Sequence, residues 1–230
     1  MEPVLLGIII ATNIAIVGGT YAWRYFRSER YKVRRAIKRA RRVPLADVAD
    51  GSLVRVTGEA RPKDGERIAA PLSGRACLLY EVIVEEYVSR GKSGSWRTII
   101  TEKDFVSAFW LADGETRALV KLDYPMVLLD QDASFRSGVL KEPDEVLVDF
   151  LARHNEAAQG MIFNRNLRYR EGIIARGEEV TVLAVAKTEP DPDPAAVPEG
   201  YRSRAMRLVL RSPAQGEMML SDKPGLTRSS

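Results

Sequence analysis

The first feature of the hydrophobic pattern is an unbroken apolar run near the N-terminus. VLLGIIIATNIAIVGGTYAW, residues 4–23, is twenty residues long and has no charged side chain. At 1.5 Å of rise per residue, a helix of this length would span about 30 Å, the thickness of a hydrocarbon core. Only Met1, Glu2 and Pro3 precede the run, whereas a cleaved signal peptide carries positive charge there. The pattern predicts a single uncleaved transmembrane helix, with the N-terminal tail, in residues 1–23.

A strongly basic segment follows. RYFRSERYKVRRAIKRARR has ten Lys/Arg and one acid, Glu29, and the spacing of Val33, Ile37 and Ala40 predicts a juxtamembrane helix within residues 24–43. Positive flanks stay on the cytoplasmic side, which predicts a cell inner membrane protein with its N-terminus outside. The cations either bind anionic lipid headgroups or only set this topology, because both effects use the same electrostatics. These cations are Arg24, Arg27, Arg30, Lys32, Arg34, Arg35, Lys38, Arg39, Arg41 and Arg42.

Beyond the basic segment, alternating apolar and polar positions predict mostly β-strands. SLVRVTGEA, CLLYEVIVEEYVS, EEVTVLAVAKTE and RAMRLVLRS are rich in β-branched or aromatic residues. DFVSAFWLADGETRALVKLD predicts a hairpin that turns at Asp113 and Gly114, a pair suited to positive φ.

Two segments depart from the strand pattern. Leu147, Phe150, Leu151 and His154 recur at helical spacing and predict an amphipathic helix of about four turns. PDPDPAAVPEGY, residues 190–201, is rich in proline and aspartate, and it predicts a solvated hairpin tip or, alternatively, a partner-binding extension.

The chain contains the same turn twice. IAAPLSGRACLLYEV and LVLRSPAQGEMMLSD both enter a Pro-x-x-Gly turn, and a β segment with Gly and Glu precedes each copy. In such a turn proline fixes φ and glycine adopts a conformation closed to other residues. We therefore predict an α+β, mostly β fold. An N-terminal transmembrane helix is followed by two small sheets or open barrels, which the twin turns suggest are duplicated, with one amphipathic helix between them.

The charge distribution and the small numbers of cysteine and histidine exclude several classes of function. The net charge is +4, but residues 43–230 have 25 Lys/Arg against 29 Asp/Glu, which argues against nucleic-acid binding by the folded domain. One cysteine and one histidine rule out an intrachain disulfide and a Cys/His zinc site. We predict no metal, cofactor or catalytic residue; a hydrolase using Cys77 and His154 is the remaining catalytic alternative, although nothing marks Cys77 as activated.

The segments around the twin turns resemble a known family. VTGEA, IAAPLSGRACLLYEVIVEE, EEVTVLAVA and LVLRSPAQGEMMLSD are similar to the GIDE/BAM-domain family, the membrane-proximal domain of a mitochondrial E3 ubiquitin ligase. The resemblance spans about residues 50–224. The matched positions, taken as structural, are Gly58, Pro71, Gly74, Cys77, Tyr80, Trp96, Pro213 and Gly216. The family ligases add a RING finger and a second membrane helix; this chain has neither, so the resemblance implies a RING-less bacterial relative without ligase activity of its own.

The first functional hypothesis is a single-pass, non-catalytic binding or scaffold module in the membrane. It would present a GIDE-like domain, residues 44–225, at the cytoplasmic face, with residues 226–230 as a disordered tail. Its expected partners are the lipid bilayer, anionic lipid headgroups and an unidentified protein. One alternative is the substrate-capture part of an E3 ubiquitin-ligase-like system in which another chain supplies the RING. The second alternative is the hydrolase.

Overall fold

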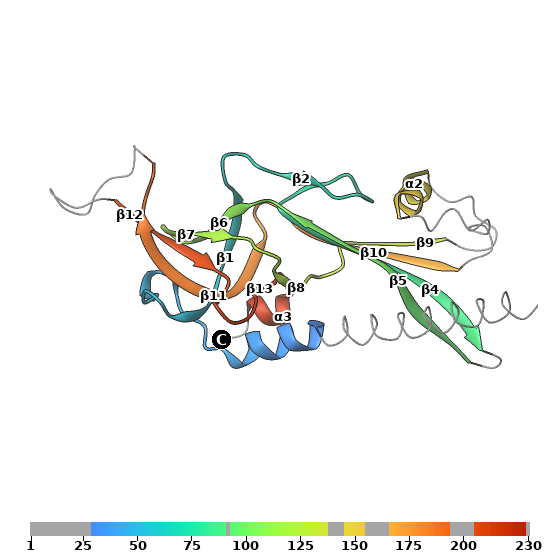
Figure 1. Cartoon of the computed structure of the whole chain (residues 1–230), viewed down its shortest axis with the longest axis horizontal. Coiled ribbons are helices and arrows are strands. Elements are labelled where there is room, and N and C mark those ends of the chain that lie inside the picture. The colour runs from blue at the N-terminus through green and yellow to red at the C-terminus, as the bar shows by residue number, and fades with distance from the viewer. Residues whose placement is uncertain (1–28, 91–92, 138–144, 155–165, 194–204, 229–230) are drawn as a thin grey trace, which may run out of the picture.

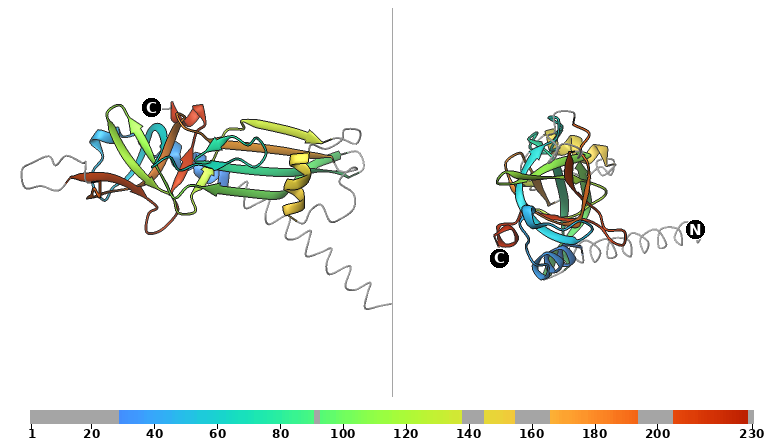
Figure 2. Two further views of the ribbon diagram at one scale, coloured as in Figure 1. Left: turned by 90° about the horizontal axis from the view of Figure 1, so that it is seen from above. Right: turned by 90° about the vertical axis from the view of Figure 1, so that its left-hand side faces the viewer.

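In the computed structural model, a β-barrel and a four-stranded sheet lie side by side along the long axis of the molecule (Figure 1). The structure describes residues 29–90, 93–137, 145–154, 166–193 and 205–228. A basic helix, residues 29–39, begins next to the sheet and runs along the outside of the barrel (Figures 1 and 2).

Five strands close the barrel. They are β1 (Leu53–Pro62), β6 (Ala108–Asp113), β7 (Thr116–Lys121), β11 (Glu179–Pro190) and β12 (Met206–Arg211). The order around the barrel is β1-β6-β7-β12-β11, and the pairing of β1 with β11 completes the ring. Neighbours are antiparallel except β7 and β12, which are parallel. This arrangement is that of a five-stranded Greek-key barrel of the OB type.

The barrel closes around residues that alternate along its strands. Val54 and Val56 of β1 and Phe109 and Leu111 of β6 belong to one buried apolar cluster inside the barrel. The predicted β6–β7 hairpin is confirmed, and Gly114 in its turn has φ 61°. Local alternation therefore predicts each strand, while the closed ring depends on pairing between strands far apart in the sequence.

Two insertions into the barrel chain build the four-stranded sheet. Its order is β5 (Ser93–Phe105), β4 (Leu79–Arg90), β10 (Leu167–Ile174) and β9 (Ala133–Ser137), and all pairs are antiparallel. The β4–β5 hairpin is inserted between β1 and β6, and β9 and β10 are inserted between β7 and β11. A short hairpin, β2 (Ile68–Ala69) and β3 (Ala76–Cys77), precedes β4.

The helix α2 (Glu145–Arg153) packs on this sheet. Leu147, Phe150 and Leu151, the stripe that predicted an amphipathic helix, are buried in one cluster with Val84 of β4 and other residues of the sheet. The helix is therefore confirmed where it is described, although it covers nine residues rather than four turns. The rest of the predicted helix, residues 155–160, lies outside the described residues, as does most of the 190–201 arm.

The apolar side of the basic helix is buried. Val33 and Ile37 are 0% exposed and pack against Leu128, Leu183 and Leu226. These three leucines come from β11 and from two short elements, β8 (Met126–Leu128) and α3 (Pro224–Thr227). A further short strand, β13 (Met219–Ser221), pairs with both β8 and β11. The helix is followed by a 3-10 turn, η1 (Leu45–Asp47). The basic helix is thus part of the folded domain.

The predicted fold class is wrong in two respects. Among the described residues, no helix is long and apolar enough to cross a membrane; the stretch predicted to do so, residues 4–23, lies outside them. The predicted pair of duplicated units is also wrong, because β1 and β11 are antiparallel neighbours in a single closed barrel. Val56 of β1 and Val182 of β11 pair with each other and fill the same core.

The C-terminal segment also differs from its prediction. Residues 226–230 were expected to form a disordered tail, but Leu226 and Thr227 are buried in α3 and only residues 229–230 lie outside the described part. Leu226 is held by its apolar contacts beneath the basic helix. A short polar sequence with one leucine does not reveal such a contact, because the partner residues are distant in the chain.

Candidate anion-binding site

The residues matched to the GIDE/BAM family do not meet in one site. Gly58 lies in β1, Tyr80 in β4 and Trp96 in β5. The first Pro-x-x-Gly turn joins β2 to β3 and the second joins β12 to β13. The turn glycines Gly74 and Gly216 have φ of 68° and 116°, which favour glycine over other residues. These positions shape turns and strands in different parts of the molecule.

Cys77 is a buried core residue. Cys77 is 1% exposed, and its Sγ lies 3.7 Å from the carbonyl oxygen of Ile68. Burial, together with the negative charge of Glu171, raises the pKa of the thiol to about 11. The thiol therefore stays protonated at neutral pH, and the hydrolase alternative lacks an activated nucleophile.

His154 contacts a carboxylate of the sheet. Its Nε2 lies 2.6 Å from Oε2 of Glu102, and the Tyr80 hydroxyl donates to Oε1 of the same carboxylate at 2.6 Å. The imidazole also packs on Phe150, with ring centroids 4.8 Å apart. These contacts fasten α2 to the sheet. Sequence reasoning missed Glu102, because nothing in its local pattern links it to a histidine about fifty residues away.

On the outer face of β6 and β7, an arginine covers one side of a tryptophan ring. Barrels of this type bind oligonucleotides and oligosaccharides on the face of their second and third strands. Here Ala108 and Leu119 are buried in a small cluster there, and the Arg117 guanidinium lies 4.4 Å from the Trp110 ring centroid. A ring covered in this way does not present that face to a base. Within the described ranges, no group of three or more His, Cys, Asp or Glu side chains could hold a metal ion.

The basic helix separates apolar from cationic side chains. Val33 and Ile37, one turn apart, face the barrel, and the cations around them face solvent. We call seven exposed cations the basic surface: Lys32, Arg34, Arg35, Lys38, Arg39, Arg41 and Arg42. None of them forms an ion pair within the part of the chain that the structure describes. Arg24 and Arg27, predicted to share the same role, lie outside that part.

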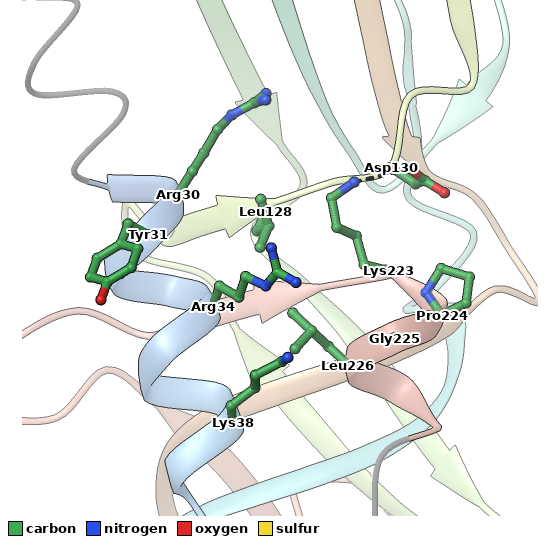
Figure 3. A pocket seen from close by; sticks show the side chains of 10 residues that line it. All are labelled: Arg30, Tyr31, Arg34, Lys38, Leu128, Asp130, Lys223, Pro224, Gly225 and Leu226. Carbon is green, nitrogen blue, oxygen red and sulfur yellow. Dashed lines mark hydrogen bonds and ion pairs between the residues drawn. The ribbon is translucent and has the colours of Figure 1, made fainter.

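A groove of about 470 Å³ lies between the basic helix and α3 (Figure 3). We call it the α3 groove. It is lined by Arg30, Tyr31, Arg34, Lys38, Leu128, Asp130, Lys223, Pro224, Gly225 and Leu226. Figure 3 shows Arg34 and Lys38 reaching from the helix toward α3, with Leu128 and Leu226 between the two walls. The groove thus combines a cationic wall with an apolar floor.

Two of the groove's cations are already paired. Arg30 Nη2 lies 2.9 Å from Oε2 of Glu81 in β4, and Lys223 Nζ lies 3.0 Å from Oδ1 of Asp130. The hydrogen bond from Lys223 holds the pKa of the Asp130 carboxyl below its usual range. Arg34 contributes a charge that no described acidic side chain neutralises.

A second groove lies at the C-terminal end of the basic helix. It has a volume of about 760 Å³ and is lined by Lys38, Arg39, Ala40, Arg41, Arg42, Pro44, Arg55 and Asp113. Arg55 is 2% exposed and donates to the carbonyl oxygens of Ala40 at 3.3 Å and Leu226 at 2.6 Å. Burial, with the positive charge of Arg42, lowers the pKa of Arg55. Its guanidinium therefore ties the end of the basic helix to α3.

The described cations form a candidate site for anions. Unpaired guanidinium and ammonium groups on a fixed frame attract phosphate and carboxylate groups, whereas no activated nucleophile or metal cluster accompanies them in the described part of the chain. Sequence reasoning identified the helix cations as a charge run but missed Lys223 and Asp130, which come from the far end of the chain and from the loop after β8.

No family model, curated protein or solved structure matches this chain, so the resemblance to the GIDE/BAM family stays a prediction.

Proposed function

We propose that this chain is a non-catalytic binding module that docks on membrane surfaces rich in anionic lipids. The observation that carries the proposal is the basic surface, in which seven exposed cations without described ion pairs lie on one side of a folded domain. The negative potential of such a membrane attracts surface-proximal basic residues by about 1 kcal/mol each.

The packing of the helix determines how the contact would be made. Amphipathic helices that enter the interface bury their own apolar face among lipid headgroups and chains. Here Val33 and Ile37 are buried against the barrel, so the described helix presents charge rather than an apolar face. Binding should therefore depend on anionic lipid and decrease with ionic strength.

The charge distribution of the whole chain favours one orientation. Residues 43–230 carry four more acidic than basic residues, with 25 Lys/Arg against 29 Asp/Glu. An anionic surface attracts the basic helix and repels the remaining body. The domain would lie with its helix toward the lipid and the β2–β3 hairpin, on the opposite side of the molecule (Figures 1 and 2), away from it.

Flotation of the full chain with vesicles tests the proposal. Binding to phosphatidylcholine vesicles is compared with binding to the same vesicles containing phosphatidylglycerol. The pair Arg35→Gln with Arg39→Gln should weaken the phosphatidylglycerol-dependent binding about thirtyfold, from about 2 kcal/mol for two surface charges. The matched control is Arg67→Gln with Arg75→Gln, two exposed cations flanking β2 and β3, which should change it little.

Two results would reject the proposal. One is equal binding to neutral and anionic vesicles. The other is an equal effect of the two charge pairs, which would show that net charge rather than the basic surface matters. All four positions are exposed, and circular dichroism should confirm that the variants remain folded.

A further inference from the structure

We infer that the α3 groove binds one phosphate monoester group. This inference rests on the proposed function, because it uses cations of the same helix, but it goes further in assigning a specific ligand group to one groove. The same chemical group occurs on a lipid of the phosphatidic acid type and on a small soluble molecule. The argument depends on three properties of the groove: its charge, its floor and its rigidity.

The charge of the groove matches a dianion. Arg34, Lys38 and Lys223 face it with one carboxylate, Asp130, while Arg30 is paired with Glu81. This leaves a surplus of two positive charges. A phosphate monoester carries about −1.5 to −2 charge near pH 7 and has three acceptor oxygens. Arginine can bind two of these oxygens at once, and lysine acts as a point charge.

The floor of the groove accepts what is attached to the phosphate. Leu128 and Leu226 are 5% and 3% exposed and lie between the cationic walls, and the Pro224–Gly225 backbone continues this surface. Tyr31, 64% exposed, stands at the rim. Glycerol carbons or the start of an acyl chain would contact these groups while the phosphate faces the cations. The volume of about 470 Å³ lies in the range of small-ligand sites.

The walls of the groove are held in place from below. Arg55 donates to the carbonyl oxygens of Ala40, after the basic helix, and Leu226, in α3. Val33 and Ile37 fix the helix against the barrel at the same level. The ligand would therefore meet a preorganised site, which lowers the entropic cost of binding.

Asp130 allows a test in which a substitution should tighten phosphate binding rather than weaken it. It competes with a ligand for Lys223 at 3.0 Å, and its hydrogen bond with Lys223 keeps its pKa low, so it remains negative at neutral pH. Asp130→Asn removes this competitor and leaves its backbone N–H, which donates to Asp222, unchanged. We expect glycerol 3-phosphate to bind this variant about two- to fivefold more tightly than the original chain.

The main experiment titrates the full chain with glycerol 3-phosphate, followed by calorimetry. Arg34→Gln with Lys38→Gln should weaken binding about tenfold or more, because each cation makes a charge-assisted contact. The pair Arg35→Gln with Arg39→Gln removes the same charge from the same helix but leaves the α3 groove intact. It should change this binding less than about threefold.

A second arm compares vesicles containing phosphatidic acid with vesicles containing phosphatidylglycerol at equal surface charge. Preference for phosphatidic acid that is lost in Arg34→Gln with Lys38→Gln supports a lipid source of the phosphate. Binding of glycerol 3-phosphate without this preference supports a soluble source.

Two outcomes overturn the inference and leave the proposed function standing. In one, the two charge pairs weaken glycerol 3-phosphate binding equally. In the other, glycerol 3-phosphate does not bind and vesicle binding follows surface charge alone. Weaker binding in Asp130→Asn would also contradict the inference, because it would place Asp130 among the groups that hold the ligand.

Discussion

Replacing Gly58 by alanine should test whether the barrel closes as described. In β1, residues Leu53–Glu59 pair with β11, and residues Glu59–Pro62 pair with β6. Gly58 therefore lies where the strand passes from one partner to the other. A Cβ at this position would lie 2.4 Å from the carbonyl oxygen of Ala112 and 2.9 Å from its carbonyl carbon.

The cost of this methyl group follows from what would have to move. The contacts must lengthen from 2.4 Å to more than 3.0 Å, and the obstructing atoms are backbone atoms of β6. Ala112 is paired with Glu59 of β1 and with Arg117 of β7, so a shift disturbs the ladders on both sides. Overpacking of this kind costs about 1–3 kcal/mol, and each weakened hydrogen bond adds about 1 kcal/mol. We expect Gly58→Ala to lower the free energy of unfolding by about 3 kcal/mol.

Thermal unfolding followed by circular dichroism would measure this effect. For a domain of this size, about 3 kcal/mol corresponds to a decrease in Tm of roughly 6–12 °C. Gly225→Ala is the matched control, because its Cβ would meet no atom within 4 Å, and it should change stability by less than about 1 kcal/mol. If Gly58→Ala melted within about 2 °C of the original chain, the close approach of β1 to β6 would be wrong.

Three further predictions concern buried or half-buried groups. Burial raises the pKa of Cys77 to about 11, so the native chain should react with a disulfide reagent at pH 8 far more slowly than the unfolded chain, and equally rapid labelling would contradict its burial. Burial also raises the pKa of Asp222 to about 7, whereas an unfolded Asp ionises near pH 3.9. Between these values the folded chain holds the proton and the unfolded chain loses it. The free energy of unfolding should therefore fall as pH rises from about 4 to about 7, by at most about 1.4 kcal/mol per pH unit. Asp222→Asn should flatten this dependence in denaturant titrations, and an unchanged slope would refute the assignment. Phe150→Ala removes a ring that is 0% exposed between α2 and the sheet. In urea titrations it should lower the free energy of unfolding by about 3–5 kcal/mol. A loss below about 1 kcal/mol would mean that α2 does not pack on the sheet.

Local patterns predicted the elements that depend on neighbours in the sequence. The β6–β7 hairpin follows from two apolar runs around Gly114, and α2 follows from the spacing of Leu147, Phe150 and Leu151. The helical spacing of Val33 and Ile37 likewise predicted the described part of the basic helix. In each case the residues whose spacing indicates the element are at most a few positions apart, although the residues they pack against are distant in the sequence.

The architecture could not be predicted in the same way, because it depends on pairing between distant segments. Val56 pairs with Val182 to close the barrel, so the two β segments that precede the twin turns lie in one barrel rather than in two duplicated units. The candidate site could not be fully predicted for the same reason. Its helix cations were visible as a charge run, but Lys223 joins Arg34 in the α3 groove only because α3 packs under the helix.

The cations of the basic helix also differ in what they are available to do, although the sequence presents them as equivalent. Arg30 is bound to Glu81, whose side chain is 9% exposed, and Glu29 lies 3.9 Å from Lys103 of β5. This end of the helix therefore braces the four-stranded sheet, while Val33 and Ile37 hold the next turns against the barrel. Neutralising Arg30 would leave a largely buried carboxylate without its partner and would lower stability, whereas neutralising the exposed cations would not. The helix thus contacts both the barrel and the four-stranded sheet with its inner side, while its outer cations stay exposed to solvent.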